Sequence, residues 1–212
     1  MDFQDKISEG IEVISANDPV LALVISRNPR PDIQPHSNYF QALASSIIGQ
    51  QLSVKAASTI RQRFADLGHK GFPRPDEVLQ MSDEVLRGVG LSNSKVKYIK
   101  DLAAHVQDGR LDLKRISNLT NDEIVVEVTD VKGIGEWTAH MFLIFCLGRL
   151  EVLPVGDLGV RNGIRILYGL RDLPDDLKIR QLAAKGKWEG YESIASWYIW
   201  KSLDTPQLDG IG

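Results

Sequence analysis

With 212 residues, 43% of them hydrophobic, and a formal net charge of −3 at pH 7, the chain suits one large or two small soluble domains. Its single cysteine, Cys146, excludes an intramolecular disulfide and a four-cysteine iron–sulfur cluster. No apolar run reaches the length of a membrane span and the N-terminus lacks a signal-peptide pattern, so we expect a cytoplasmic protein in a prokaryote or a nuclear one in a eukaryote.

The N-terminal segment predicts two helices followed by a linker. Apolar residues recur at helical spacing over 3–16, and Asp18-Pro19 supplies a cap and a first-turn proline for a short second helix. Residues 28–35 then contain three prolines, which indicates a linker between two lobes.

A tight loop joins the two helices that come next. An apolar helix is predicted over 39–48, and Ser53 can cap another over 54–67. Gln50 and Gln51 lie in the loop between them. Two amides in such a place can satisfy their own turn, or they can reach toward a bound molecule.

A first glycine hairpin lies at Gly88–Leu91, between a short helix and a longer one over 93–107. This region has an excess of positive charge, which together with Lys132 can form one basic face for a nucleic acid. An ordinary solvated surface gives the same pattern. The basic residues concerned are Arg87, Lys95, Lys97, Lys100, Arg110, Lys114 and Arg115.

The segment 120–146 repeats the order helix, hairpin, helix. Thr120 with Glu123 forms a capping box, Val131–Gly135 is a second glycine hairpin, and a helix runs from Glu136 to about residue 146. Glycines spaced one apart let the backbone approach another molecule, and the next helix directs free N–H groups at it. This hairpin therefore suits a phosphate, whereas we interpret the earlier copy at 88–91 as structural.

Asp157 follows a turn at Pro154–Gly156 and precedes a helical pattern over 158–168. It can be an ordinary helix N-cap or a carboxylate that takes part in chemistry. Two more helices are predicted, over 172–185 and 191–202, and no stretch alternates like a strand. The predicted fold class is all-α, with about ten helices.

Three of these segments, taken together and in this order, resemble a known family. They are SSIIGQQLSVKAASTI at 45–60, VKGIGEWTAHMF at 131–142 and LPVGDLGVR at 153–161. They resemble the helix-hairpin-helix-GPD superfamily of DNA base-excision glycosylases, in its 3-methyladenine DNA glycosylase II branch. The resemblance implies two helical lobes with a cleft between them: 1–35 with 154–212, and 36–153, which carries the helix-hairpin-helix.

The resemblance also implies roles for individual residues. Gln51, or Gln50 beside it, would wedge into the space left by a displaced base. Asp157 would stabilise the cationic transition state of base release. The hairpin would bind a DNA phosphate, and the carbonyls of Val131 and Gly133 would share a monovalent cation with it. The phosphate-binding residues of the hairpin would be Lys132, Gly133, Ile134 and Gly135.

Trp137 stands two residues past the last hairpin glycine, where bifunctional members of the family carry a lysine nucleophile. An aromatic wall attracts positively charged alkylated purines, so Trp137, Met141 and Tyr191 are the expected base pocket. A tryptophan on such a helix can instead belong to the core. Gly190 and Glu192 replace the proline and arginine that the family usually has beside the Tyr191 position.

We therefore expect a monofunctional DNA glycosylase that flips out and hydrolyses alkylated purines of the 3-methyladenine and 7-methylguanine type. It would act as a monomer on double-stranded DNA in base excision repair, without a cofactor other than the hairpin cation. The four histidines show no zinc-ligand spacing. The alternatives are a non-catalytic helix-hairpin-helix DNA-binding module and a bifunctional glycosylase/lyase for another lesion.

Overall fold

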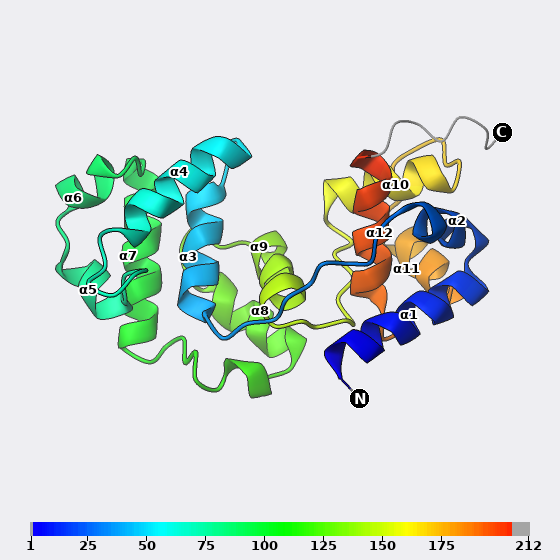
Figure 1. The fold of residues 1–212 in the computed structure, drawn as a ribbon, viewed down its shortest axis with the longest axis horizontal. Coiled ribbons are helices and arrows are strands. Elements are labelled where there is room, and N and C mark those ends of the chain that lie inside the picture. The colour runs from blue at the N-terminus through cyan, green and yellow to red at the C-terminus, as the bar shows by residue number, and fades with distance from the viewer. Residues whose placement is uncertain (1, 205–212) are drawn as a thin grey trace. The chain divides into compact units, whose positions relative to one another are not determined.

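The structure, a computed structural model, describes residues 2–204 (Figure 1). Within that range it contains twelve α-helices, one 3₁₀ turn, one π-helical turn and no strand, which confirms the all-α class. Residues 75–88, where one short helix was predicted, form two. None of the helices in residues 2–204 combines the length and the apolar character needed to cross a membrane.

The chain divides into two compact units. Unit 2 is the continuous segment Pro35–Leu147, and unit 1 combines the segment up to Gln34 with the segment from Gly148 onward. The second segment of unit 1 therefore begins at Gly148 and not at residue 154, where the sequence analysis placed it. The reason is that residues 150–152 bind the last helix: the Leu150 carbonyl accepts from the Ser193 N–H, and the Val152 N–H donates to Ser193 Oγ.

Unit 1 is built around its C-terminal helix. Seven consecutive residues of that helix, Ser193–Ile199, are buried, because neighbouring helices surround it. α12 lies against α1, α2 and α10. The helices of unit 1 are α1 (Phe3–Asn17), α2 (Pro19–Arg27), α10 (Leu158–Leu167), α11 (Asp176–Lys185) and α12 (Glu192–Asp204).

Asp18 is a buried charge that ties distant parts of unit 1 together. As the N-cap of α2, its Oδ1 accepts hydrogen bonds from the backbone N–H groups of Val20 and Leu21. Its Oδ2 accepts from the hydroxyl of Tyr168 at 2.5 Å and from the indole N–H of Trp188 at 3.0 Å. These four bonds compensate the cost of burying the carboxylate and fix the ends of α10 and α11 against α2.

Unit 2 is organised around α7, which packs against α3, α5 and α6. The helix predicted from Glu136 to Cys146 begins as α9 and changes at Phe142 to a π-helical turn, in which the Leu147 N–H donates to the Phe142 carbonyl. The elements of unit 2 are α3 (Tyr39–Gly49), α4 (Val54–Ala65), α5 (Pro75–Gln80), α6 (Asp83–Gly88), α7 (Asn93–Gln107), the 3₁₀ turn η1 (Ile116–Asn118), α8 (Asn121–Thr129), α9 (Glu136–Met141) and the π turn η2 (Phe142–Cys146).

Candidate functional site

The two glycines of the hairpin between α8 and α9 serve different purposes. Gly133 has a φ of +84°, and a Cβ there would lie 2.2 Å from the ring of Tyr98 on α7. The packing within unit 2 therefore requires a glycine at position 133. Gly135 has an ordinary negative φ of −99°, and nothing lies within 4 Å of the Cβ position. It leaves a bare, open stretch of backbone at the start of α9.

The internal hydrogen bonds of the hairpin narrow the predicted set of phosphate donors. The Lys132 N–H donates to Asp101 Oδ2 at 2.8 Å, and the Ile134 N–H donates to the Val131 carbonyl at 3.1 Å. The N–H groups of Gly133 and Gly135 make no hydrogen bond within residues 2–204. Of the four predicted residues, these two glycines keep a backbone donor for a phosphate.

The carbonyls expected to hold a monovalent cation each accept one hydrogen bond within unit 2. The Val131 carbonyl accepts the N–H of Ile134, and the Gly133 carbonyl accepts the side-chain amide of Gln50 at 2.8 Å. A carbonyl oxygen has two lone pairs and can accept a second partner beside such a bond, so the cation at Val131 and Gly133 stays a prediction. Residues 2–204 also contain no group of three or more His, Cys, Asp or Glu side chains that could hold a metal ion.

The loop between α3 and α4 separates the two glutamines. Gln50 is half-buried and directed to the hairpin, whereas Gln51 is exposed and has a left-handed φ of +57°. Gln51 is thus the side chain available to a bound duplex. Two apolar residues that the sequence interpretation did not single out follow it at the surface: Leu52 is 38% exposed and Val54 83% exposed.

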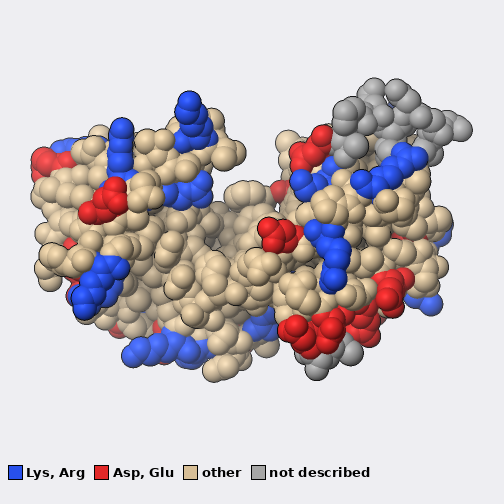
Figure 2. Space-filling model, in the orientation of Figure 1, with Lys and Arg blue, Asp and Glu red and all other residues tan. Residues whose placement is uncertain are grey.

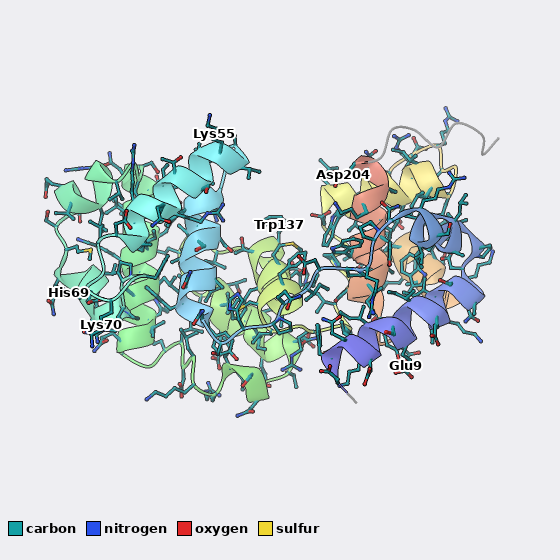
Figure 3. All side chains as sticks on the ribbon, viewed as in Figure 1. Glu9, Lys55, His69, Lys70, Trp137 and Asp204 are labelled. Carbon is teal, nitrogen blue, oxygen red and sulfur yellow. The ribbon has the colours of Figure 1, made fainter. Side chains whose placement is uncertain are left out.

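Trp137 lies at the surface, on the first turn of α9 (Figure 3). Its side chain is 54% exposed, which rules out the alternative that it belongs to the core. Met141 follows four residues later and therefore lies on the same face of the helix. Its side chain is half-buried. The indole face of Trp137 is therefore accessible to a molecule bound at this surface.

Asp157 is an N-cap whose carboxylate also binds a tryptophan. It is 8% exposed, and its Oδ1 accepts the Val160 N–H at 2.6 Å and the indole N–H of Trp200 at 2.8 Å. Gly159 permits this approach, because a Cβ there would lie 3.0 Å from both the carboxylate and the indole. The sequence interpretation missed Trp200, although the aromatic residues of the last predicted helix were a signal.

Tyr191, the third predicted pocket residue, does not lie beside Asp157. It precedes Trp200 by nine residues, so about 13 Å of helix axis separates them. Its ring packs against Gly10 of α1, and burial followed by a hydrogen bond to Glu9 raises its pKa. Within unit 1, Trp200 rather than Tyr191 is the aromatic neighbour of Asp157.

The predicted residues, together with Trp200, thus fall into two groups. Unit 1 carries Asp157 with Trp200, and unit 2 carries the hairpin, the glutamine loop and Trp137. A family model described as "HhH-GPD superfamily base excision DNA repair protein" matches residues 44–188. This range includes the glutamine loop, the hairpin, Trp137 and Asp157. The chain belongs to this superfamily.

Relatives of this HhH-GPD protein fall in the branch that the sequence motifs resemble. DNA-3-methyladenine glycosylase 1 of Schizosaccharomyces pombe is 36% identical over 174 residues, which cover 80% of this chain and 72% of that protein. A DNA-3-methyladenine glycosylase of Saccharomyces cerevisiae is 32% identical over 221 residues, covering 95% and 72%. The alkylbase branch of the family is therefore confirmed.

Solved structures agree with the fold of the HhH-GPD chain. The 3-methyladenine DNA glycosylase of S. pombe in complex with abasic DNA has a TM-score of 0.81 and 30% identity, covering 93% of this chain and 97% of that one. The crystal structure of a DNA-3-methyladenine glycosidase from Bacillus halodurans has a TM-score of 0.80 and 39% identity, covering 92% and 89%.

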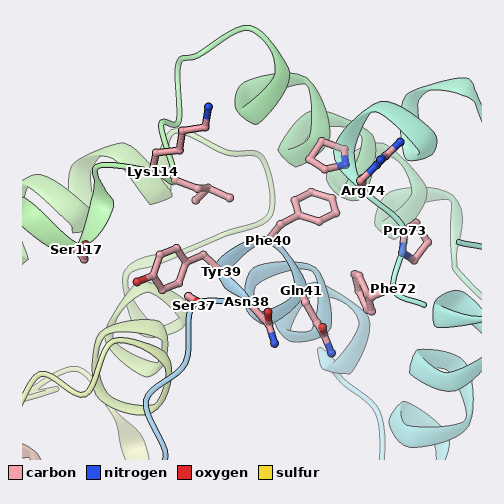
Figure 4. A pocket seen from close by; sticks show the side chains of 12 residues that line it. Ser37, Asn38, Tyr39, Phe40, Gln41, Phe72, Pro73, Arg74, Lys114 and Ser117 are labelled. Atoms are coloured by element: carbon pink, nitrogen blue, oxygen red, sulfur yellow. The ribbon is translucent and has the colours of Figure 1, made fainter. Parts of the chain in front are cut away.

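A cavity of about 640 Å³ in this HhH-GPD chain lies away from the predicted site (Figure 4). Tyr39, Phe40 and Phe72 line it, at the N-terminal end of α3, with Arg74 and Lys114 at its rim. The eleven residues of α3 span about 16 Å, and Gln51 follows the other end. The cavity is therefore not the expected base pocket.

The basic residues over 86–115 do not form one uncompensated basic face. Lys95 is part-buried against backbone carbonyls, and four other cations pair with carboxylates. The pairs are Arg87–Glu84, Lys100–Asp83, Arg110–Asp108 and Arg115–Glu127. Figure 2 shows Lys and Arg side chains spaced over unit 2, whereas acidic side chains gather over α1 in unit 1. On the face of unit 2 that Figure 2 shows, the positive side chains are thus spread apart and do not form one patch.

Proposed function

We propose that this chain is a monofunctional DNA glycosylase that extrudes alkylated purines from double-stranded DNA and hydrolyses their bond to deoxyribose. The observation that carries the proposal is Trp137, 54% exposed at the position where bifunctional relatives need a lysine. With no amine there, water is the nucleophile. The relatives named DNA-3-methyladenine glycosylases support purines alkylated at N3 or N7 as the substrates.

Each element has a part in the proposed reaction. The N–H groups of Gly133 and Gly135 bind a DNA phosphate at the hairpin, and Gln51 occupies the space of the extruded base. The face of Trp137 attracts a cationic purine by about 0.5 to 2 kcal/mol over a neutral one. The reaction requires no cofactor, and a monomer carries all of these parts.

Asp157 supplies the charge that the transition state needs. As the glycosidic bond breaks, its electron pair leaves with the purine and the sugar becomes an oxocarbenium ion. A carboxylate nearby stabilises that cation and orients the water that adds to C1′. An N3- or N7-alkylated purine leaves as a neutral base, so no general acid is required. The products are a free base and an abasic site with an intact strand.

The test is to incubate methylated duplex DNA with the protein and to separate the released bases by chromatography. We expect free 3-methyladenine and 7-methylguanine, with no covalent adduct trapped by borohydride. Binding without base release would support a non-catalytic module instead. A trapped adduct, or strand cleavage, would support a glycosylase/lyase.

A further inference from the structure

Lys95 of α7 holds the end of another helix. Its Nζ donates to the Ile48 carbonyl at 2.8 Å and to the Gln50 carbonyl at 2.7 Å. The last carbonyls of α3 have no partners within the helix, and a cation at a helix C-terminus also interacts favourably with the helix dipole. Burial of this side chain lowers its pKa. A part-buried ammonium bound only to carbonyls is costly to maintain, so its contacts point to a specific use.

The loop that Lys95 holds is the one that presents Gln51. Two backbone hydrogen bonds close this loop, and both are longer than the usual length of about 2.9 to 3.0 Å. The Gln50 N–H donates to the Ile47 carbonyl at 3.4 Å, and the Leu52 N–H donates to the Gly49 carbonyl at 3.2 Å. Gln51 has a left-handed φ of +57°, a conformation that is strained for a residue with a Cβ. Such a conformation persists only where the surroundings impose it.

One face of α7 joins this loop to the hairpin. Lys95, Tyr98 and Asp101 are spaced three residues apart and therefore lie along one side of the helix. Lys95 binds the glutamine loop, Tyr98 packs on Gly133, and Asp101 accepts the Lys132 N–H. The hydrogen bond from the Gln50 amide to the Gly133 carbonyl joins the loop directly to the hairpin. The glutamine loop and the hairpin are thus both held by α7.

We propose that Lys95 is a positioning residue for base extrusion: its two hydrogen bonds hold Gln51 in the left-handed conformation and at a fixed distance from the phosphate-binding hairpin. This inference rests on the proposed glycosylase function. If it is correct, Lys95 increases the rate of base release where the base must be displaced from a pair, and has little effect where the base is already unpaired.

The experiment compares base release from the same lesion in a fully paired duplex and in single-stranded DNA, under single-turnover conditions. Lys95→Met keeps the length of the side chain but removes its donors, and Lys95→Gln keeps one shorter donor without the charge. Lys97→Met is the matched control, because Lys97 is an exposed lysine of the same helix. The thermal midpoint of each variant is recorded beside its rates.

We expect Lys95→Met to lose about tenfold or more on the paired duplex and less than about threefold on the single strand. Lys95→Gln should show a smaller loss with the same preference, and it answers the question if Lys95→Met does not fold. Lys97→Met should keep the wild-type ratio of the two rates, because any contact that Lys97 makes to a phosphate is present in both DNAs. Equal losses on the two DNAs, or none on the duplex, would overturn the role of Lys95. A wild type that releases no base from either DNA would instead overturn the proposed function, and this inference with it.

Discussion

The indole N–H of Trp200 donates a 2.8 Å hydrogen bond to Oδ1 of Asp157, across 43 residues of sequence. The same oxygen accepts the Val160 N–H at 2.6 Å. Two donors on one oxygen fix the orientation of the carboxylate. Asp157 is therefore more than a helix cap: α12 holds it in a set orientation.

Asp157→Asn tests the chemical role directly. Asparagine caps helices as well as aspartate does and still offers an oxygen to Val160 and Trp200, so unit 1 should fold normally. We expect the rate of base release to fall by about 10²-fold to 10³-fold, because the transition state loses its counter-charge. DNA affinity, measured by fluorescence anisotropy, should stay within about threefold. Unchanged base release would refute the catalytic assignment.

Trp200→Phe removes the indole donor and keeps an aromatic ring. We expect base release to fall on the order of tenfold, which corresponds to one hydrogen bond to a charged group. The matched control is Trp197→Phe, since the Trp197 ring packs on Tyr198 in the same helix. If Trp200→Phe and Trp197→Phe lower the single-turnover rate equally, the bond to Asp157 has no special part in the reaction.

Trp137→Leu tests recognition of the cationic base. Leucine preserves an apolar surface but has no π face, so the preference for a charged purine over a neutral one should fall by about twofold to thirtyfold. The measurement is the ratio of kcat/KM for 7-methylguanine to kcat/KM for hypoxanthine, each in the same duplex. An unaltered ratio would show that the exposed indole does not read the charge of the base.

The two hairpin glycines make a matched pair. Gly133→Ala forces a methyl group into the Tyr98 ring at a positive φ, so it should destabilise the fold by more than about 2 kcal/mol. A methyl group at Gly135 would meet nothing within 4 Å in residues 2–204, so Gly135→Ala should change the free energy of unfolding by less than about 0.5 kcal/mol. Its DNA affinity should still fall about tenfold, because the methyl group obstructs the phosphate. Full affinity in Gly135→Ala would place the phosphate elsewhere.

Glu192, at the start of α12, makes the stability of unit 1 depend on pH. Its pKa lies above the ordinary value of 4.5, mainly because the side chain is buried, and its Oε2 has no hydrogen-bond partner among the described residues 2–204. Since the folded pKa exceeds the unfolded one, ionisation opposes folding as the pH rises through the folded value. Glu192→Gln should therefore unfold at the same urea concentration as the wild type at acid pH and at a higher one at neutral pH. A difference independent of pH would contradict this.

Local patterns in the sequence were enough to predict much of this protein. The capping box of Thr120 and Glu123, the cap at Asp18 and the two glycine hairpins depend on residues within one or two turns of each other, and all occur as expected. The all-α class follows from the same short-range periodicity. The identity of residue 137, which excludes an amine nucleophile, is a property of the sequence alone.

Only the tertiary structure decided which side chains meet. Gln50 binds Gly133 across 83 residues, Lys95 binds the Gln50 carbonyl across 45, and Trp200 reaches Asp157 across 43. These contacts separate Gln51 from Gln50, bring the Gln50 amide to the Gly133 carbonyl, and set Tyr191 apart from Asp157. Spacing along a helix fixes the face on which a residue lies, but the partner on that face depends on how helices pack, and that is a property of the whole folded unit.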